Sequence, residues 1–171
     1  MPEPLQRIAI VGPESTGKST LARGLADYFQ TRWVPEFARA YLEQIERPYA
    51  REDLLVIARA QRKMEEKLAP LAFRYLFCDT NLLVIRIWSE YKYGQCDPWI
   101  LAHERLDRYA LHLLTDIDLP WEEDPLREHP HARAELMSLY EHALVQAGVP
   151  YAKISGHAEE RLRHALAALG R

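Results

Sequence analysis

A glycine-bounded loop near the start of the chain carries the clearest chemical signal in the sequence. Residues 12–19 read Gly-Pro-Glu-Ser-Thr-Gly-Lys-Ser, directly after an apolar run and directly before a helical pattern. Glycines let such a loop curl so that successive backbone N–H groups point at a phosphate. A helix that begins at the loop adds unpaired N–H groups and the positive end of its dipole. Lys18 can then reach the β- and γ-phosphates, and the Ser19 hydroxyl can hold Mg²⁺.

This loop predicts a site for a nucleoside triphosphate, and we expect ATP with Mg²⁺. The alternative, a connector that matches the pattern by chance, is disfavoured by the strand and helix signals on either side. A GTPase would carry an Asn-Lys-x-Asp segment, and the sequence contains none. A small phosphotransferase is therefore favoured. The residues expected to contact the nucleotide are Gly12, Glu14, Ser15, Thr16, Gly17, Lys18, Ser19 and Thr20.

Two acidic residues follow predicted strands and are candidates for handling an acceptor hydroxyl. Glu36 follows the run 32–35, and Asp79 ends the run 75–79. The carboxyl edge of a parallel sheet is where such folds bind ligands. Glu36 can accept a hydroxyl proton, and Asp79 can hold Mg²⁺ or bond a substrate hydroxyl. Two alternatives stay open: Glu36 forms a plain surface ion pair with Arg39, or Asp79 caps the next helix.

A segment rich in proline, tryptophan and charge covers about residues 119–134 and shows no clear periodicity. We expect it to form a lid. Its Arg127 and Arg133 could neutralise charge on a transferring phosphoryl group, and closure of the lid would exclude water. The alternative is that both arginines are solvated, as most arginines are.

The elements that must position these residues alternate along the chain. Predicted strands cover 5–11, 32–35, 75–79, 109–114 and 149–154, and predicted helices cover 18–30, 36–45, 51–69, 82–93, 132–147 and 159–169. Strands that alternate with helices are typical of βαβ units and a parallel sheet. We predict a single domain over residues 1–171, with a three-layer α/β fold of the phosphate-loop type. About five parallel strands carry helices on both faces, in the nucleoside-monophosphate-kinase variety.

Composition narrows the partners. The 171 residues hold 22 Lys and Arg against 25 Asp and Glu, a net charge of −3, so no basic excess points to nucleic acid. No apolar run reaches the length of a membrane span, and the first residues do not resemble a signal peptide. Cys78 and Cys96 show no metal-ligand spacing, and Cys78 is expected as a reduced core residue. We expect a cytoplasmic protein with a small-molecule substrate and leave a homo-oligomer open.

The chain resembles the ribosylnicotinamide kinase domain of the bacterial NadR proteins over nearly its whole length. The matching segments are 12–20, Glu36-Phe-Ala-Arg39, Phe77-Cys-Asp-Thr80, Trp88-Ser-Glu-Tyr91, Asp116-Ile-Asp-Leu-Pro-Trp121, Leu126-Arg127 and Ile154-Ser-Gly156 with Arg161. The resemblance implies ATP-dependent phosphorylation of the 5′-hydroxyl of nicotinamide riboside to nicotinamide mononucleotide, in NAD salvage. Two departures stand out, because relatives often have Asp at the position of Asn81 and Gly at the position of Pro125.

The residues and the resemblance together assign roles. Lys18, Glu36, Asp79 and Arg127 are expected to be catalytic, and Arg127 and Arg161 to contact ATP, Arg161 by resemblance only. The expected substrate contacts are Glu36, Arg39, Asp79, Asn81 and Trp88, and the expected metal ligands are Ser19 and Asp79. Trp88, Tyr91, Trp99 and Trp121 could stack on a cationic pyridinium ring, or they simply fill the core.

Two other functions stay open at this point. The chain could phosphorylate another nucleoside or a small hydroxylated metabolite, an alternative that Asn81 supports because it removes a carboxylate near the expected site. It could also be a nucleotide-dependent switch or binding module whose partner is another protein.

Overall fold

A parallel sheet of five strands forms the centre of the computed structural model, which describes residues 4–171. The strands are β1 (Gln6–Val11), β2 (Arg32–Val34), β3 (Tyr75–Asp79), β4 (Leu111–Thr115) and β5 (Tyr151–Ile154). They lie in the order β2-β3-β1-β4-β5, and every neighbouring pair is parallel. The predicted fold class is confirmed.

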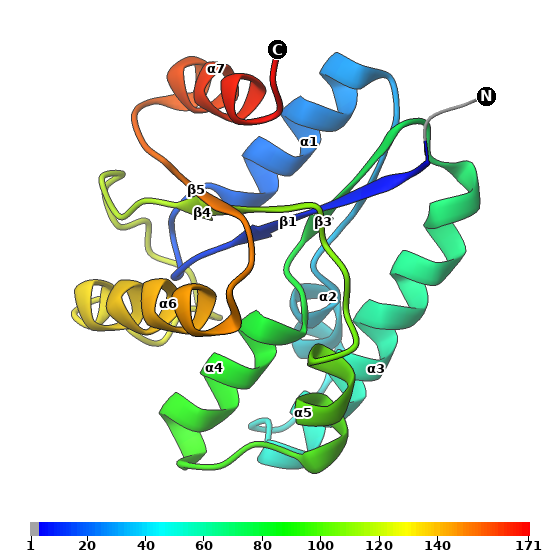
Figure 1. The fold of residues 1–171 in the computed structure, drawn as a ribbon. Coiled ribbons are helices and arrows are strands. Elements are labelled where there is room, and N and C mark those ends of the chain that lie inside the picture. The colour runs from blue at the N-terminus through cyan, green and yellow to red at the C-terminus, as the bar shows by residue number, and fades with distance from the viewer. Residues whose placement is uncertain (1–3) are drawn as a thin grey trace.

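Helices cover both faces of this sheet. They are α1 (Lys18–Phe29), α2 (Phe37–Gln44), α3 (Arg51–Leu68), α4 (Leu82–Tyr93), α5 (Pro98–Glu104), α6 (Arg133–Ala147) and α7 (Ala158–Ala168), with a short 3₁₀ turn at Ala69–Leu71. Figure 1 shows α1 and α7 on one side of the sheet, and α3, α4 and α6 on the other. The arrangement gives three layers.

The central strand shows how the sequence builds these layers. Successive side chains of a strand point to opposite faces. Ile8 and Ile10 pack in the cluster that includes α1 and α7, whereas Ala9 and Val11 pack against α4 and α6. All four are fully buried, so the strand reads as a continuous apolar run rather than an alternating one.

The predicted element boundaries agree with the structure to within about two residues, with two differences worth noting. The fourth strand begins at Leu111 rather than Tyr109, and the Tyr109 hydroxyl donates a hydrogen bond to Glu65 at 2.7 Å. The segment 99–105, for which no element was assigned, contains most of α5. Its first turn is fixed by Asp97, whose side chain accepts a hydrogen bond from the backbone N–H of Trp99.

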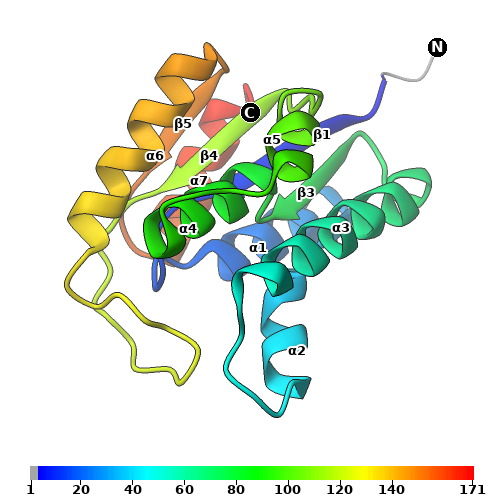
Figure 2. The same cartoon turned by 90° about the horizontal axis from the view of Figure 1, so that it is seen from below.

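One edge of the sheet gathers the connections that matter for chemistry. Each strand leads at its carboxyl end into a loop or helix there, as expected for parallel strands. In Figure 2, α2 and the irregular segment 116–132 both project from this edge, on the side of the molecule away from the N-terminus. Glu36 and Asp79 were predicted to lie at this edge.

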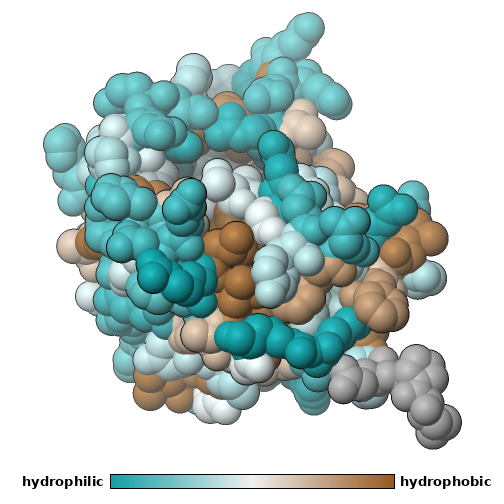
Figure 3. All heavy atoms as spheres, turned by 90° about the horizontal axis from the view of Figure 1, so that it is seen from above, coloured by the Kyte–Doolittle hydropathy of each residue, from teal (hydrophilic) through white to brown (hydrophobic). Residues whose placement is uncertain are grey.

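The remaining surface is ordinary. The face that carries α1 and α7 is mostly hydrophilic, with apolar atoms in small groups rather than in one large patch (Figure 3). Across residues 4–171, no helix is both long and apolar enough to cross a membrane. Cys78 is a buried free thiol, as predicted.

Candidate active site

The loop between β1 and α1 adopts a strongly curled backbone. Gly12, Ser15 and Gly17 have φ angles of +144°, +56° and +75°. The Thr16 hydroxyl donates to the carbonyl oxygen of Pro13 at 2.7 Å and lies 2.6 Å from the hydroxyl oxygen of Thr115 at the end of β4. These contacts tie the loop to the sheet. Curled main chain at a helix N-terminus is the geometry that binds phosphate groups.

We expect Gly12→Ala to damage both the fold and nucleotide binding. A Cβ atom there would lie 2.6 Å from the Thr115 hydroxyl oxygen and 2.9 Å from the Thr115 carbonyl oxygen, at a φ that L residues rarely adopt. Such backbone strain alone costs about 1–3 kcal/mol. Denaturant unfolding and calorimetric titration with ATP and Mg²⁺ measure the two effects. Gly148→Ala is the matched control. Gly148 also has a positive φ, +63°, but no neighbouring atom of residues 4–171 would lie within 4 Å of the new Cβ atom. An ATP affinity of Gly12→Ala equal to that of Gly148→Ala would contradict the prediction.

Lys18, Ser19 and Asp79 form the polar centre of the site. The Lys18 ammonium donates to the carbonyl oxygens of Gly12 and Pro13, at 3.0 and 2.8 Å. The Ser19 hydroxyl donates a short hydrogen bond to one carboxylate oxygen of Asp79. The other oxygen, Oδ1, is buried and has no hydrogen-bond partner among residues 4–171. Burial raises the pKa of Asp79, against the opposing effects of the Ser19 hydroxyl and the Lys18 charge.

Glu36 stands at the exit of β2, at the N-cap position of α2. It lines the same cavity as Lys18. Burial raises its pKa and the negative charge of Asp79 raises it further, while Lys18 lowers it. The carboxylate therefore holds a proton more readily than an exposed glutamate, which favours a role as general base.

Arg39 does not form the ion pair with Glu36 that the sequence left open as an alternative. Its guanidinium lies 2.9 Å from the Asp124 carboxylate and 3.7 Å from that of Glu43. Asp124 belongs to the segment 116–132, so Arg39 joins α2 to that segment. Glu36 and Arg39 both line the cavity.

The structure corrects the prediction for Asn81. Its side chain is buried, does not line the cavity, and accepts a hydrogen bond from the Val84 N–H at 3.3 Å. Asn81 is thus the N-cap of α4, a role that asparagine and aspartate fill well. The capping role considered for Asp79 belongs to Asn81, which leaves Asp79 for the site.

A cavity of about 640 Å³ runs along this edge of the sheet. One end lies between the phosphate loop and α7, at Thr20, Ala158 and Leu162. The other end lies between α2, α4 and the segment 116–132. Of the four aromatic candidates, Trp88 and Tyr91 line this second end. Trp99 stacks on His103 instead, and the Trp121 ring lies beside the guanidinium groups of the predicted lid arginines.

The phosphate loop holds the segment 116–132 in place through Glu14. The Glu14 carboxylate accepts hydrogen bonds from the backbone N–H groups of Glu128, at 3.2 Å, and His129, at 3.0 Å. Glu128 is in turn bonded to Lys92 at 2.7 Å and to the Tyr49 hydroxyl. The segment is therefore bonded to both the phosphate loop and α4, and several of its residues line the cavity. Its role as a lid stays a prediction.

Both predicted lid arginines lie against the phosphate loop. Arg127 donates to the carbonyl oxygen of Glu122 at 2.5 Å and lies 3.4 Å from the Ser15 hydroxyl. Arg133 donates to the carbonyl oxygens of Ser15 and Leu119, at 3.2 and 2.8 Å. The alternative that both arginines are simply solvated is wrong, because both side chains are half-buried in these contacts. Their contact with a triphosphate stays a prediction.

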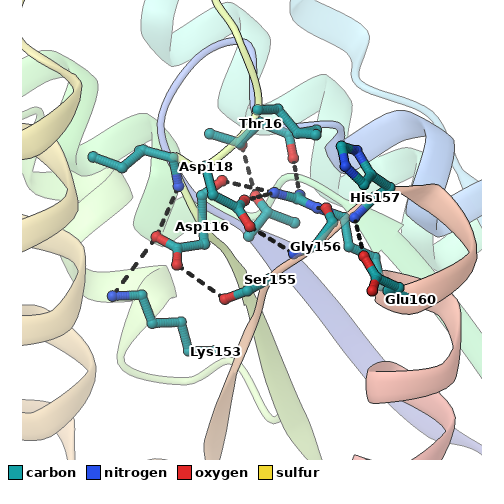
Figure 4. Close-up of polar contacts among 12 residues, drawn as sticks. Thr16, Asp116, Asp118, Lys153, Ser155, Gly156, His157 and Glu160 are labelled. Carbon is teal, nitrogen blue, oxygen red and sulfur yellow. Dashed lines mark hydrogen bonds and ion pairs between the residues drawn. The ribbon is translucent and has the colours of Figure 1, made fainter.

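Arg161, expected by resemblance to contact ATP, is a buried residue of α7. It is 3% exposed. Figure 4 shows three of its partners close together: Thr16, Asp118 and Gly156. Arg161 donates to the carbonyl oxygens of Thr16, Gly156 and Asp116 and to the Asp118 carboxylate. Arg161 lines the cavity, but these four contacts use each of its side-chain nitrogen atoms. Its role in the structure is therefore to hold the phosphate loop against the segments around it.

Two residues that belong to the site were missed in the sequence. The Tyr49 hydroxyl accepts hydrogen bonds from Trp88 Nε1 at 3.0 Å and Lys92 Nζ at 2.6 Å, which fixes the cavity wall. Gln61 is buried on α3 behind Glu36 and Asp79. The signal for Gln61 was available, because it follows Leu54, Ile57 and Ala58 on the apolar face of its helix.

Comparison with known proteins supports this architecture. Residues 7–161 match the AAA_28 family model, described as an AAA domain. The chain is 26% identical over 158 residues to the trifunctional NAD biosynthesis/regulator protein NadR of Escherichia coli, covering 88% of this chain and 38% of that protein. It spans less than half the length of this relative.

Solved structures extend the likeness. A crystal structure of NadR in complex with NR superposes with a TM-score of 0.84 at 21% identity, over 97% of this chain and 49% of that one. Thymidylate kinase from Ehrlichia chaffeensis gives a TM-score of 0.72 at 15% identity, over 98% of this chain and 100% of that one. The predicted resemblance to NadR is confirmed, and so is the phosphate-loop kinase fold.

Proposed function

This chain belongs to the AAA_28 family of AAA domains. We propose that it is an ATP-dependent phosphotransferase whose phosphate loop binds the triphosphate of ATP. The proposed reaction moves the γ-phosphoryl group of ATP to the 5′-hydroxyl of nicotinamide riboside. One observation carries the proposal: a glutamate with a raised pKa shares a cavity with the phosphate-loop lysine. The likeness to NadR supports the choice of acceptor.

Each residue contributes positioning or charge to the transfer. The curled loop and Lys18 hold the triphosphate, and Glu36 accepts the proton of the acceptor hydroxyl as that oxygen attacks phosphorus. Arg127, in the closed segment over the loop, neutralises charge on the transferring phosphoryl oxygens. Closure of that segment excludes water, which would otherwise compete as acceptor.

The residues present fit a Mg²⁺ ion. Ser19 and Asp79 offer hard oxygen atoms side by side, and Asp79 Oδ1 is buried without a partner among residues 4–171. When bound, the ion neutralises charge on the β- and γ-phosphates. Ser19 would hold it directly, and Asp79 would hold it directly or through water.

We expect the acceptor to bind at the end of the cavity between α2, α4 and the segment 116–132, here called the acceptor end. The charges there favour a nucleoside over a nucleotide as acceptor. Recognition of an acceptor phosphate needs a free cation, and Arg39 is already paired with Asp124 and Glu43. The same end carries the Glu36 and Glu14 carboxylates, which repel an anion and tolerate a cationic ring. Trp88 and Tyr91 offer aromatic faces to such a ring.

A panel of acceptors tests the proposal. The protein is incubated with ATP–Mg²⁺ and nicotinamide riboside, adenosine, cytidine, thymidine or thymidine monophosphate, and products are identified by mass. We expect phosphorylation of nicotinamide riboside, and thymidine monophosphate unchanged. If only a different nucleoside is phosphorylated, that nucleoside is the acceptor and nicotinamide riboside is not. Slow ATP hydrolysis with no phosphorylated acceptor would favour the nucleotide-dependent switch.

A further inference from the structure

We propose that Gln61 is a positioning residue for the transfer, because its side-chain amide joins the two chain segments that carry Glu36 and Asp79. This inference rests on the proposed function, in which those carboxylates act together. Gln61 itself lies outside the cavity lining and touches neither substrate site directly. Its effect on the reaction is therefore indirect.

The amide spans both segments with three hydrogen bonds. Its oxygen accepts from the Phe37 N–H at 2.8 Å, and its nitrogen donates to the Pro35 carbonyl oxygen at 3.1 Å. These partners are the residues on either side of Glu36. The same nitrogen lies 3.5 Å from the Asp79 carbonyl oxygen. One side chain thus fixes the backbone around one carboxylate and contacts the residue that carries the other.

Burial makes this bridge rigid. Gln61 is 1% exposed, and the same face of α3 holds Leu54, Ile57 and Ala58, all fully buried. An amide in such surroundings is costly unless its hydrogen bonds are made, and these bonds have no water to compete with them. The polar side chain is unnecessary for packing α3, since an apolar residue of that size would fill the space. The amide is instead explained by its hydrogen bonds to the segments that carry Glu36 and Asp79.

The bridge also satisfies a backbone donor of α2. Phe37 is the first residue of the helix, so its N–H has no acceptor within α2. The side-chain oxygen of Gln61 provides that acceptor. Glu36, the N-cap residue, lines the cavity. Because small errors in the placement of reacting groups cost large factors in rate, loss of the bridge should affect turnover.

Gln61→Met tests this role, because it keeps the side-chain length and removes all three hydrogen bonds. We expect kcat for nicotinamide riboside to fall at least tenfold while the calorimetric Kd for ATP–Mg²⁺ stays within twofold. The pKa of the Glu36 carboxyl, followed by carbon NMR and assigned through Glu36→Gln, should shift from its wild-type value. Ile57→Val is the control, since it lies one turn earlier on α3 and removes one buried methyl group.

The outcomes separate this inference from the proposed function. Wild-type-like kcat and an unmoved Glu36 titration in Gln61→Met would overturn the positioning role. A shifted titration in a protein that phosphorylates no acceptor would overturn the proposed function and uphold the bridge. Should Gln61→Met fail to fold, Gln61→Glu carries the same comparison. It keeps the shape and the acceptor for the Phe37 N–H, and an unchanged kcat and titration would overturn the inference.

Discussion

Lys18→Ala is expected to lower kcat by at least about a hundredfold, which corresponds to about 2.7 kcal/mol of transition-state stabilisation. In the structure the Lys18 ammonium is held by two carbonyl oxygens of its own loop, those of Gly12 and Pro13. These are neutral acceptors, so the charge is available to a phosphate. Enzymes that transfer phosphoryl groups accelerate the reaction mainly by stabilising the negative charge on the γ-phosphoryl oxygens. Removal of the Lys18 cation should therefore slow the transfer step itself.

Single-turnover kinetics with excess enzyme measures this effect on the chemical step. Lys63→Ala is the control, because Lys63 is an exposed lysine on α3 and should leave kcat unchanged. Turnover of Lys18→Ala close to that of Lys63→Ala would remove Lys18 from the mechanism. Folding is checked by thermal unfolding. Within residues 4–171 the Lys18 ammonium makes two hydrogen bonds, both inside its own loop, so its loss should leave the fold intact.

The fold was predictable because its signals are local. Strands such as 75–79 are apolar up to their last residue, and the helices between the strands show clear periodicity. The loop 12–19 could be assigned for the same reason, since the residues that curl it are neighbours in sequence. The parallel sheet then placed Glu36 and Asp79 at one edge.

Pairings between distant segments could not be predicted in this way. The sequence suggested a contact between Glu36 and Arg39 because helical spacing favours it, but Asp124 lies nearer in space and takes the guanidinium. Nothing in the helical pattern around Arg161 indicated that its guanidinium would bond to the carbonyl oxygen of Thr16 and to Asp118. Such choices depend on where loops meet after folding, which helical or strand periodicity does not encode.

Asn81 shows a different reason for error. Its chemistry suits both ligand binding and helix capping, and the sequence position fits either role. The structure selects capping because the side chain reaches the Val84 N–H of its own helix. Buried polar residues on apolar helix faces are a more useful sign, and Gln61 is one of these residues, as are Asp53 and Glu65 on the same helix.

Glu36→Gln is expected to lower kcat by about 10² to 10⁴, the usual contribution of general-base catalysis. The amide keeps the shape of the side chain but cannot accept a proton, so the Kd for ATP–Mg²⁺ should change little. Wild-type kcat should fall as the pH drops through the pKa of Glu36, which burial places above its ordinary value of 4.5. The variant should lack this acid limb. Glu46→Gln, at an exposed site, should keep the wild-type pH profile.

The same substitution should stabilise the fold, because the native state binds the Glu36 proton more tightly than the unfolded chain does. The free energy of unfolding therefore falls as the pH rises from about 4.5 through the raised pKa, and the loss persists at higher pH. Glutamine carries no charge and avoids this loss. Denaturant unfolding at pH 8 should give a higher midpoint for Glu36→Gln than for wild type, and at pH 4 the two midpoints should converge. A variant that is less stable at pH 8 would show that Glu36 serves the fold rather than the reaction.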